Sequence, residues 1–159
     1  MEKKEFKITI DAPRNKVWET LWNDATYREW TSLFAAGSRA ETDWKKGSKV
    51  SFLDARNSGM VSTIVENKPN EFLSIKHLGI IKNGVEDLAS DEARQWAGAY
   101  ENYRLLSVNG KTELVVDMGG AEISGEFMDY FMNAWPKALD KLKNWLKVTR
   151  LFFHKTRNT

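Results

Sequence analysis

The sequence of 159 residues contains no cysteine, two histidines, three prolines and ten glycines. Without cysteine the chain cannot form a disulfide framework, a thiol nucleophile or a cysteine-ligated zinc site, and two histidines are too few for a histidine metal cluster. So little proline and glycine argues against low complexity and against a long disordered segment. No apolar run approaches the ~18–20 residues that a membrane span needs, and the amino end has no apolar export signal. We therefore expect a cytoplasmic protein with no metal site and no cofactor.

Aromatic side chains are abundant instead: the sequence has seven Trp, eight Phe and four Tyr. Hydrophobic residues make up 42% and charged residues 29%, as in ordinary soluble domains. A chain of this length buries roughly 68–70% of its unfolded surface, which is enough for a substantial core. The sequence shows no internal repeat and no linker. We expect residues 1–148 to form one domain and residues 149–159 to form a basic, aromatic tail.

The amino-terminal part of the sequence predicts one strand followed by two short helices. Residues 6–10 alternate apolar and polar side chains, which is the period of a strand with one buried face. Asp11 suits the cap of a following helix and Pro13 its first turn, because proline needs no amide donor there. Asp24 is expected to begin the second short helix.

The middle of the chain predicts an antiparallel meander. Asn109-Gly110 is its strongest turn signal, because both residues accept the positive φ of a tight hairpin. Residues 82–95 interrupt the series as a polar stretch and predict a loop or a short helical excursion. The predicted strands cover residues 49–55, 60–66, 71–80, 100–108 and 112–118.

The carboxyl-terminal part predicts a long amphipathic helix. From Ser124 onward apolar residues recur every three or four positions, among them Phe131, Trp135 and Leu142. The order of elements is that of an α+β helix-grip fold, in which a curved antiparallel sheet wraps around the last helix and two short helices follow the first strand.

Several segments resemble a known superfamily, the START-like or SRPBCC proteins, and within it the AHSA-type branch, which is named for the activator of a heat-shock chaperone ATPase. The similar segments are Phe6-Lys-Ile-Thr-Ile-Asp-Ala-Pro13, Lys16-Val-Trp18, Tyr27-Arg-Glu-Trp30, residues 100–106, residues 112–116 and Trp135-Pro-Lys-Ala-Leu139. The resemblance covers residues 4–148. It implies a helix-grip fold with a cavity between the sheet and the last helix that holds a small hydrophobic or amphipathic molecule. Members of the superfamily include lipid carriers, polyketide cyclases and co-chaperone domains.

Nine residues are candidates for lining such a cavity. Tyrosine and tryptophan bring a polar tip to an apolar wall, and methionine adapts to ligands of irregular shape. Ordinary core packing is the alternative for each of them. The candidates are Trp44, Phe52, His77, Trp96, Tyr100, Tyr103, Met128, Phe131 and Met132.

His77 is the candidate with titratable chemistry. It falls on the strand face of Leu73 and Ile75, and a pocket histidine there could orient a ligand or relay a proton. The alternative is a histidine at a strand end or on the convex face, hydrogen-bonded to a neighbour. Three further charged residues fall within strand patterns and would mark the polar end of a ligand only if they faced inward: Asp54, Arg56 and Arg104.

The carboxyl-terminal end is basic, with seven Lys or Arg and one acid from Lys137 onward, although the net charge is only +2. A solvated helix face is the simplest interpretation, and the whole-chain charge does not indicate nucleic-acid binding. Residues 151–153 are Leu-Phe-Phe, which also fits weak contact with an anionic membrane surface or with a protein. These three residues could equally pack on the domain or join two copies as a homodimer.

The sequence is compatible with three functions. The first is a module that binds a small hydrophobic ligand. The second is a cyclase- or hydrolase-like enzyme in the same cavity, and the third is an AHSA-type interaction protein. No catalytic residue is assigned, because the sequence has no nucleophile elbow, phosphate loop or dinucleotide fingerprint. An inward-facing titratable pair would favour the enzyme, a closed apolar cavity would favour carriage, and a filled core would favour the interaction role.

Overall fold

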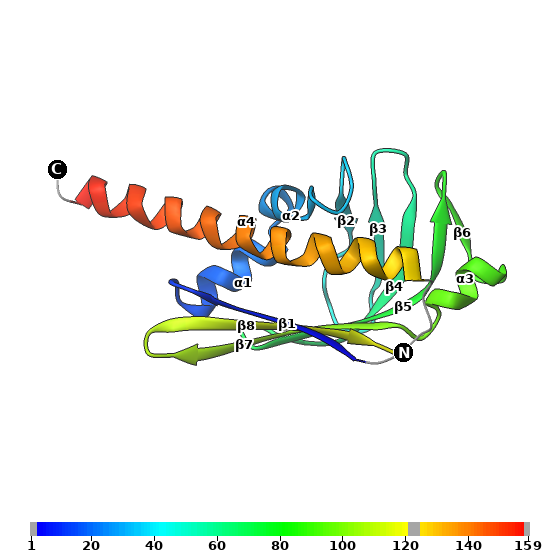
Figure 1. The fold of residues 1–159 in the computed structure, drawn as a ribbon, viewed down its shortest axis with the longest axis horizontal. Coiled ribbons are helices and arrows are strands. Elements are labelled where there is room, and N and C mark those ends of the chain that lie inside the picture. Colours follow the sequence, from blue (N-terminus) through cyan, green and yellow to red (C-terminus); the bar gives the residue numbers. More distant parts are fainter. Residues whose placement is uncertain (1–2, 121–124, 158–159) are drawn as a thin grey trace.

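The computed structural model is an α+β arrangement in which one antiparallel sheet curves around a long carboxyl-terminal helix (Figure 1). It describes residues 3–120 and 125–157, and places side chains over 3–120 and 129–147. In chain order the elements are β1 (Lys4–Ile10), α1 (Arg14–Trp22), α2 (Asp24–Thr31), β2 (Arg39–Glu41), β3 (Lys49–Leu53), β4 (Gly59–Lys68), β5 (Phe72–Lys82), β6 (Val85–Asp87), α3 (Asp91–Trp96), β7 (Tyr100–Val108), β8 (Lys111–Gly119) and α4 (Gly125–Arg157).

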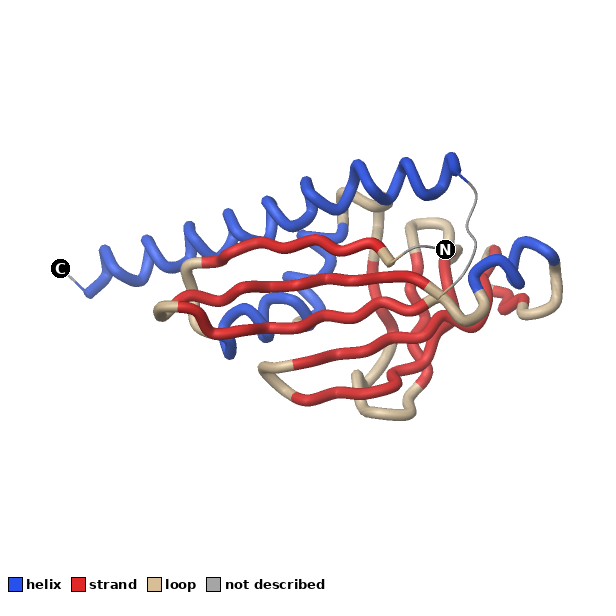
Figure 2. Tube along the Cα trace, turned by 60° about the horizontal axis from the view of Figure 1, so that its bottom comes forward, coloured by secondary structure: helices blue, strands red, loops and turns tan. Residues whose placement is uncertain are grey.

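The strands follow one another across the sheet in the order β1-β8-β7-β5-β4-β3-β2, and β6 pairs with β5. Figure 2 shows the long strands side by side, with α4 stretched along them. The predicted meander is confirmed, and the polar stretch after β5 contains the short helix α3. The strands β2 and β6 add to the predicted set. Each has only three residues, and such a short segment shows too little alternation of apolar and polar side chains to be predicted as a strand.

The alternation in β1 produces one buried face. In the β1–β8 register Phe6 lies opposite Val116 and Ile8 lies opposite Leu114, so apolar side chains meet on the same side of the sheet. The β7–β8 hairpin turns at Asn109-Gly110, where φ is +52° and +80°, as the sequence predicts.

The two short helices begin close to their predicted positions. Pro13, rather than Asp11, occupies the N-cap position of α1, so the predicted position of this cap is wrong. Proline fits this position because its fixed φ is compatible with the extended backbone there. Helix α2 begins at Asp24 as predicted, and the side chain of Asn23 accepts a hydrogen bond from the amide of Ala25 (3.1 Å).

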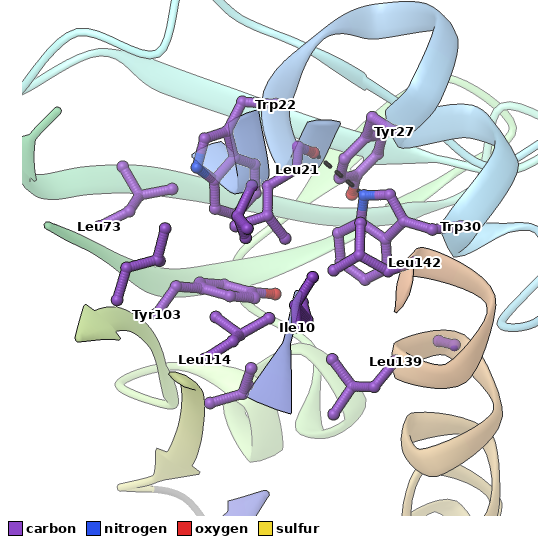
Figure 3. Packing of buried hydrophobic residues seen from close by; sticks show 14 of the residues in the cluster. Ile10, Leu21, Trp22, Tyr27, Trp30, Leu73, Tyr103, Leu114, Leu139 and Leu142 are labelled. Carbon is purple, nitrogen blue, oxygen red and sulfur yellow. Dashed lines mark hydrogen bonds between the residues drawn. The ribbon is translucent and has the colours of Figure 1, made fainter. Parts of the chain in front are cut away.

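The core lies between the inner face of the sheet, the α1–α2 pair and the middle of α4 (Figure 3). Figure 3 shows Leu139 and Leu142 of α4 in the same cluster as Trp30, whose indole N–H donates to the carbonyl of Leu21 (3.1 Å). The buried residues of α4 recur at helical spacing and are Ala134, Trp135, Ala138, Leu139, Leu142 and Leu146. None of the helices in the described ranges combines the length and hydrophobicity that crossing a bilayer requires.

Trp135 is the largest of these α4 side chains and is 3% exposed. We expect Trp135→Ala to lower the free energy of unfolding by about 3–5 kcal/mol, because it leaves a large cavity among packed rings. Trp135→Phe should cost less, since it keeps a ring and removes an indole N–H that has no hydrogen-bond partner among the described residues. Urea unfolding followed by circular dichroism measures both variants. A Trp135→Ala curve equal to that of the wild type would contradict the assignment of this helix face to the core.

Candidate functional site

A cavity of about 420 Å³ opens at the end of the sheet where α3 and the early turns of α4 meet strands β3 to β5. Its volume lies within the roughly 300–1,000 Å³ of typical small-molecule sites. Most of its surface is apolar. The apolar wall is formed by Phe34, Phe52, Leu53, Met60, Ile80, Ile81, Trp96 and Phe131.

Strand register aligns part of this wall. Phe52 of β3 lies opposite Met60 of β4, and Met60 lies opposite Ile80 of β5, so the three residues form one row across three strands. Trp96 of α3 and Phe131 of α4 complete the wall, with ring centroids 5.7 Å apart. The cavity therefore depends on contacts between elements that are distant in sequence.

Polar side chains line the exposed edge of the cavity. Lys82 Nζ lies 2.7 Å from Glu92 Oε2, and this hydrogen bond, together with the charge of the carboxylate, raises the pKa of Lys82. Asp54 also lines the cavity, and its Oδ1 accepts a hydrogen bond from the Ser58 amide (3.1 Å). An apolar wall with a polar edge suits a molecule that has both kinds of surface.

A chain of buried polar side chains lies behind the aromatic wall. His77 of β5 is 2% exposed, and its ring centroid lies 6.1 Å from that of Phe52 and 6.2 Å from that of Trp96. Its Nδ1 lies 2.6 Å from Ser62 Oγ on β4, and its Nε2 lies 3.0 Å from Glu101 Oε1 on β7. A hydroxyl, an imidazole and a carboxylate are thus joined in one line.

The Glu101 carboxylate is the charged member of this chain. Burial by itself raises its pKa, but the hydrogen bond from His77, the favourable electrostatic interaction with that side chain and a hydrogen bond from the Tyr103 hydroxyl (2.6 Å) outweigh burial. The pKa of Glu101 is therefore below its usual value. Burial, reinforced by the charge of Glu101, raises the pKa of Tyr103 and of Tyr27. At neutral pH the carboxyl is ionised and both phenols are neutral.

Three of the nine predicted pocket residues line the cavity: Phe52, Trp96 and Phe131. His77 lies behind the first two, on the buried face of β5 that also carries Ile75, which is the face that the alternation predicts. Its imidazole packs edge-to-face against both rings.

The other predicted residues take different positions. Trp44 and Tyr103 belong to the aromatic packing around Trp22, and Tyr100 packs over the end of β8. Met132 is half-buried on α4 and is not part of the described cavity wall. The side chain of Met128 lies outside the described residues.

Glu101 and Ser62 belong to the buried chain, and neither is among the nine residues predicted from the sequence. Glu101 stands two positions before the core residue Tyr103 on β7, so alternation alone could have placed this acid on the inner face. Ser62 carries no comparable signal. Its contact with His77 depends on the β4–β5 register, which shifts between Val61 and Ser62.

Metal binding has no candidate site in the described part of the chain, where no group of three or more potential ligands among His, Asp and Glu is assembled. Of the acids at the cavity edge, Asp54 accepts from backbone amides and Glu92 pairs with Lys82. The arrangement is therefore suited to enclosing an apolar group, with a polar chain one layer deeper.

Comparison with known proteins agrees with this architecture. A family model described as activator of Hsp90 ATPase homolog 1-like protein matches residues 11–147. No curated protein sequence matches the chain.

Solved structures share the fold at low sequence identity. The Aha1 dimer of Colwellia psychrerythraea is 18% identical, with 92% of this chain and 96% of that chain covered and a TM-score of 0.68. Protein MLL2253 of Mesorhizobium loti is 16% identical, with 93% and 98% covered and a TM-score of 0.70. CalU16 of Micromonospora echinospora is 15% identical, with 98% and 82% covered and a TM-score of 0.63. At such identity the likeness establishes the fold.

The buried carboxylate predicts a pH-dependent contribution to stability. Glu101→Gln is expected to lower the free energy of unfolding at neutral pH by about 1.5–3 kcal/mol, the range for hydrogen bonds to a charged group. Because the folded-state pKa is lowered, the carboxylate stabilises the fold above its unfolded-state pKa, and this stability is lost as the pH falls through the folded-state value. The difference between wild type and variant should therefore shrink below about pH 4.

Chemical denaturation at a series of pH values from neutral to acidic measures this difference. Glu113→Gln is the matched control, because Glu113 lies on β8 between the core residues Thr112 and Leu114 and faces the other side of the sheet. A difference for Glu101→Gln that stays constant into the acidic range would contradict the lowered pKa.

Proposed function

The chain belongs to the family of activator of Hsp90 ATPase homolog 1-like proteins, and we propose that it binds a small hydrophobic or amphipathic molecule, such as a lipid, in the cavity at the end of its sheet. The observation that carries this proposal is an apolar cavity walled by aromatic rings from β3, α3 and α4. The ligand's apolar body would contact Phe52, Trp96 and Phe131. Its polar group would lie at the edge near Ser58 and Lys82.

The cavity lies at a more specific position than the sequence predicts, which is only between the sheet and the last helix. Between the sheet and the middle of α4, the space is filled by side chains such as Trp135, Leu139 and Tyr103. The cavity lies instead near the start of α4, beside Tyr130 and Phe131. A ligand there can enter without displacing the central core, because Tyr130 is half-exposed and the polar edge faces solvent.

Native mass spectrometry on gently purified protein is the direct test of a carried ligand. Extra mass that disappears on denaturation would identify the molecule and support the proposal. When the protein carries no such mass, titration with the dye 1-anilinonaphthalene-8-sulfonate tests whether the cavity accepts an amphipathic aromatic molecule. An absence of saturable dye binding would then contradict the proposal.

Filling the cavity should weaken that binding. Ala35 lines the cavity, while the next residue, Ala36, is exposed and is not part of the described wall. Ala35→Trp is expected to weaken dye binding by about tenfold or more, which corresponds to ~1.4 kcal/mol, because its indole would occupy the ligand's volume. Ala36→Trp adds the same side chain outside the wall and should leave affinity unchanged. Equal weakening by both variants would show that the dye binds elsewhere.

A homodimer is a second candidate property, favoured by the path of α4. The helix continues to Arg157, eleven residues beyond its last described core residue, Leu146, and Figure 1 shows this end extending past the sheet. The similar Aha1 of Colwellia psychrerythraea is described as a dimer. An extended basic end could alternatively contact an anionic membrane surface or another protein.

Removal of residues 149–159 tests this role. We expect the shortened chain to keep the fold and its melting temperature, because the described core contacts of α4 end at Leu146. If these residues join two copies, analytical ultracentrifugation should show a dimer for the full chain and a monomer for the shortened one. A dimer that survives the deletion would place the contact elsewhere. Loss of soluble folded protein would show that the segment belongs to the domain.

A further inference from the structure

The buried polar chain behind the cavity has a definite order of donors and acceptors. Tyr103 donates to Oε2 of Glu101, whose Oε1 faces His77 Nε2, and His77 Nδ1 faces the hydroxyl of Ser62. An imidazole with its proton on Nε2 satisfies both hydrogen bonds in which His77 takes part. It donates to the carboxylate and accepts from the Ser62 hydroxyl.

In this hydrogen-bonded chain, one atom is positioned to react with a ligand. Both nitrogens of His77 are engaged, one by Glu101 and one by Ser62. The imidazole therefore has no free nitrogen to offer a ligand, and the Ser62 Oγ is the end of the chain on that side. A serine hydroxyl bonded to an imidazole that is itself oriented by a carboxylate is the arrangement that activates a serine nucleophile.

Stability alone does not account for the chain. Burying ionisable groups carries a desolvation cost, and apolar residues of similar size are often as stabilising in such places. His77 is 2% exposed, the Glu101 side chain is 20% exposed and Ser62 is fully buried. A largely buried set of titratable groups next to a cavity is characteristic of functional sites.

Strand register places Ser62 in the row of side chains next to the row that lines the cavity. On β3 and β4, Phe52 lies opposite Met60 in the row that lines the cavity, and Val50 lies opposite Ser62 in the next row on the same face. Only the row that contains Phe52 and Met60 thus separates the Ser62 hydroxyl from the cavity. Met60 is half-buried, unbranched and adaptable, so its movement would extend the cavity to Ser62.

We propose that Ser62 is a nucleophile that accepts the acyl group of an apolar ester held in the cavity. The proposal rests on the ligand site described above, because the acyl chain would occupy the volume walled by Phe52, Trp96 and Phe131. Ser62 Oγ attacks the carbonyl carbon while its proton passes to His77 Nδ1, and Glu101 stabilises the imidazolium. The carbon–oxygen bond to the leaving alcohol then breaks, and His77 returns the proton to that oxygen. The products are acyl-Ser62 and a free alcohol.

The test uses 4-nitrophenyl hexanoate and follows the intact mass of the full chain. We expect one hexanoyl group per chain, located on Ser62 by peptide mapping, and faster labelling in Met60→Ala, where the covering side chain is shortened. Ser62→Ala should abolish the label, and His77→Gln should slow it by about tenfold or more. Ser74→Ala, on the neighbouring strand β5 and outside the buried chain, is the matched control and should be labelled like the wild type.

Several results would overturn the proposal. They are no label in either the wild type or Met60→Ala, a label that persists in Ser62→Ala, or labelling that His77→Gln leaves unchanged. Circular dichroism melting of each variant establishes that it is folded. Dye binding to the wild type separates the two proposals. Saturable dye binding without acylation overturns the nucleophile and leaves the ligand site standing, whereas an absence of saturable dye binding contradicts the ligand site itself.

Discussion

The packing of one indole, that of Trp135, holds the layers of this molecule together. Its ring centroid lies 4.9–6.2 Å from the rings of Phe6, Trp30, Phe34 and Tyr103, which belong to β1, α2, the segment after α2, and β7. These contacts fix α4 over the sheet. They also fix Phe131, one turn earlier on α4, against Trp96 and Phe34. The cavity thus owes its shape to an aromatic cluster of which only Phe34 also lines it, since a helix seated differently would not bring these rings to the end of the sheet.

The cavity and the buried polar chain are formed by successive rows of side chains on the same strands. Apolar side chains occupy the row at the cavity, and the next row inward carries Ser62 and His77. A carboxylate at this depth is tolerable only because it accepts hydrogen bonds from two neighbours, Tyr103 and His77. A ligand that passed the apolar row would contact the Ser62 hydroxyl in the row behind it. Water has little access there, so electrostatic interactions are strong.

The sequence predicts the elements of the fold far better than it predicts the site. Strand alternation, the Asn109-Gly110 turn and the helical spacing around Trp135 are local signals, and each one is confirmed. The site depends on register and on packing between distant elements. Trp44 and Trp96 are equivalent candidates in the sequence, yet Trp44 packs against the core while Trp96 lines the cavity. The partnership of Ser62 and His77 follows from a register shift in β4–β5 that no local pattern encodes.

The outer strands of the sheet determine how copies of this chain can meet. Exposed strand edges offer unpaired amides and carbonyls to other chains, and proteins limit this hazard with short edges and with charge. Here one outer strand, β2, has only three residues. The other outer strand, β1, carries Lys4, Glu5 and Lys7. Glu5 Oε1 lies 3.5 Å from Lys7 Nζ. Growth of the sheet from chain to chain is therefore disfavoured at β1 and β2, the two ends of the strand order.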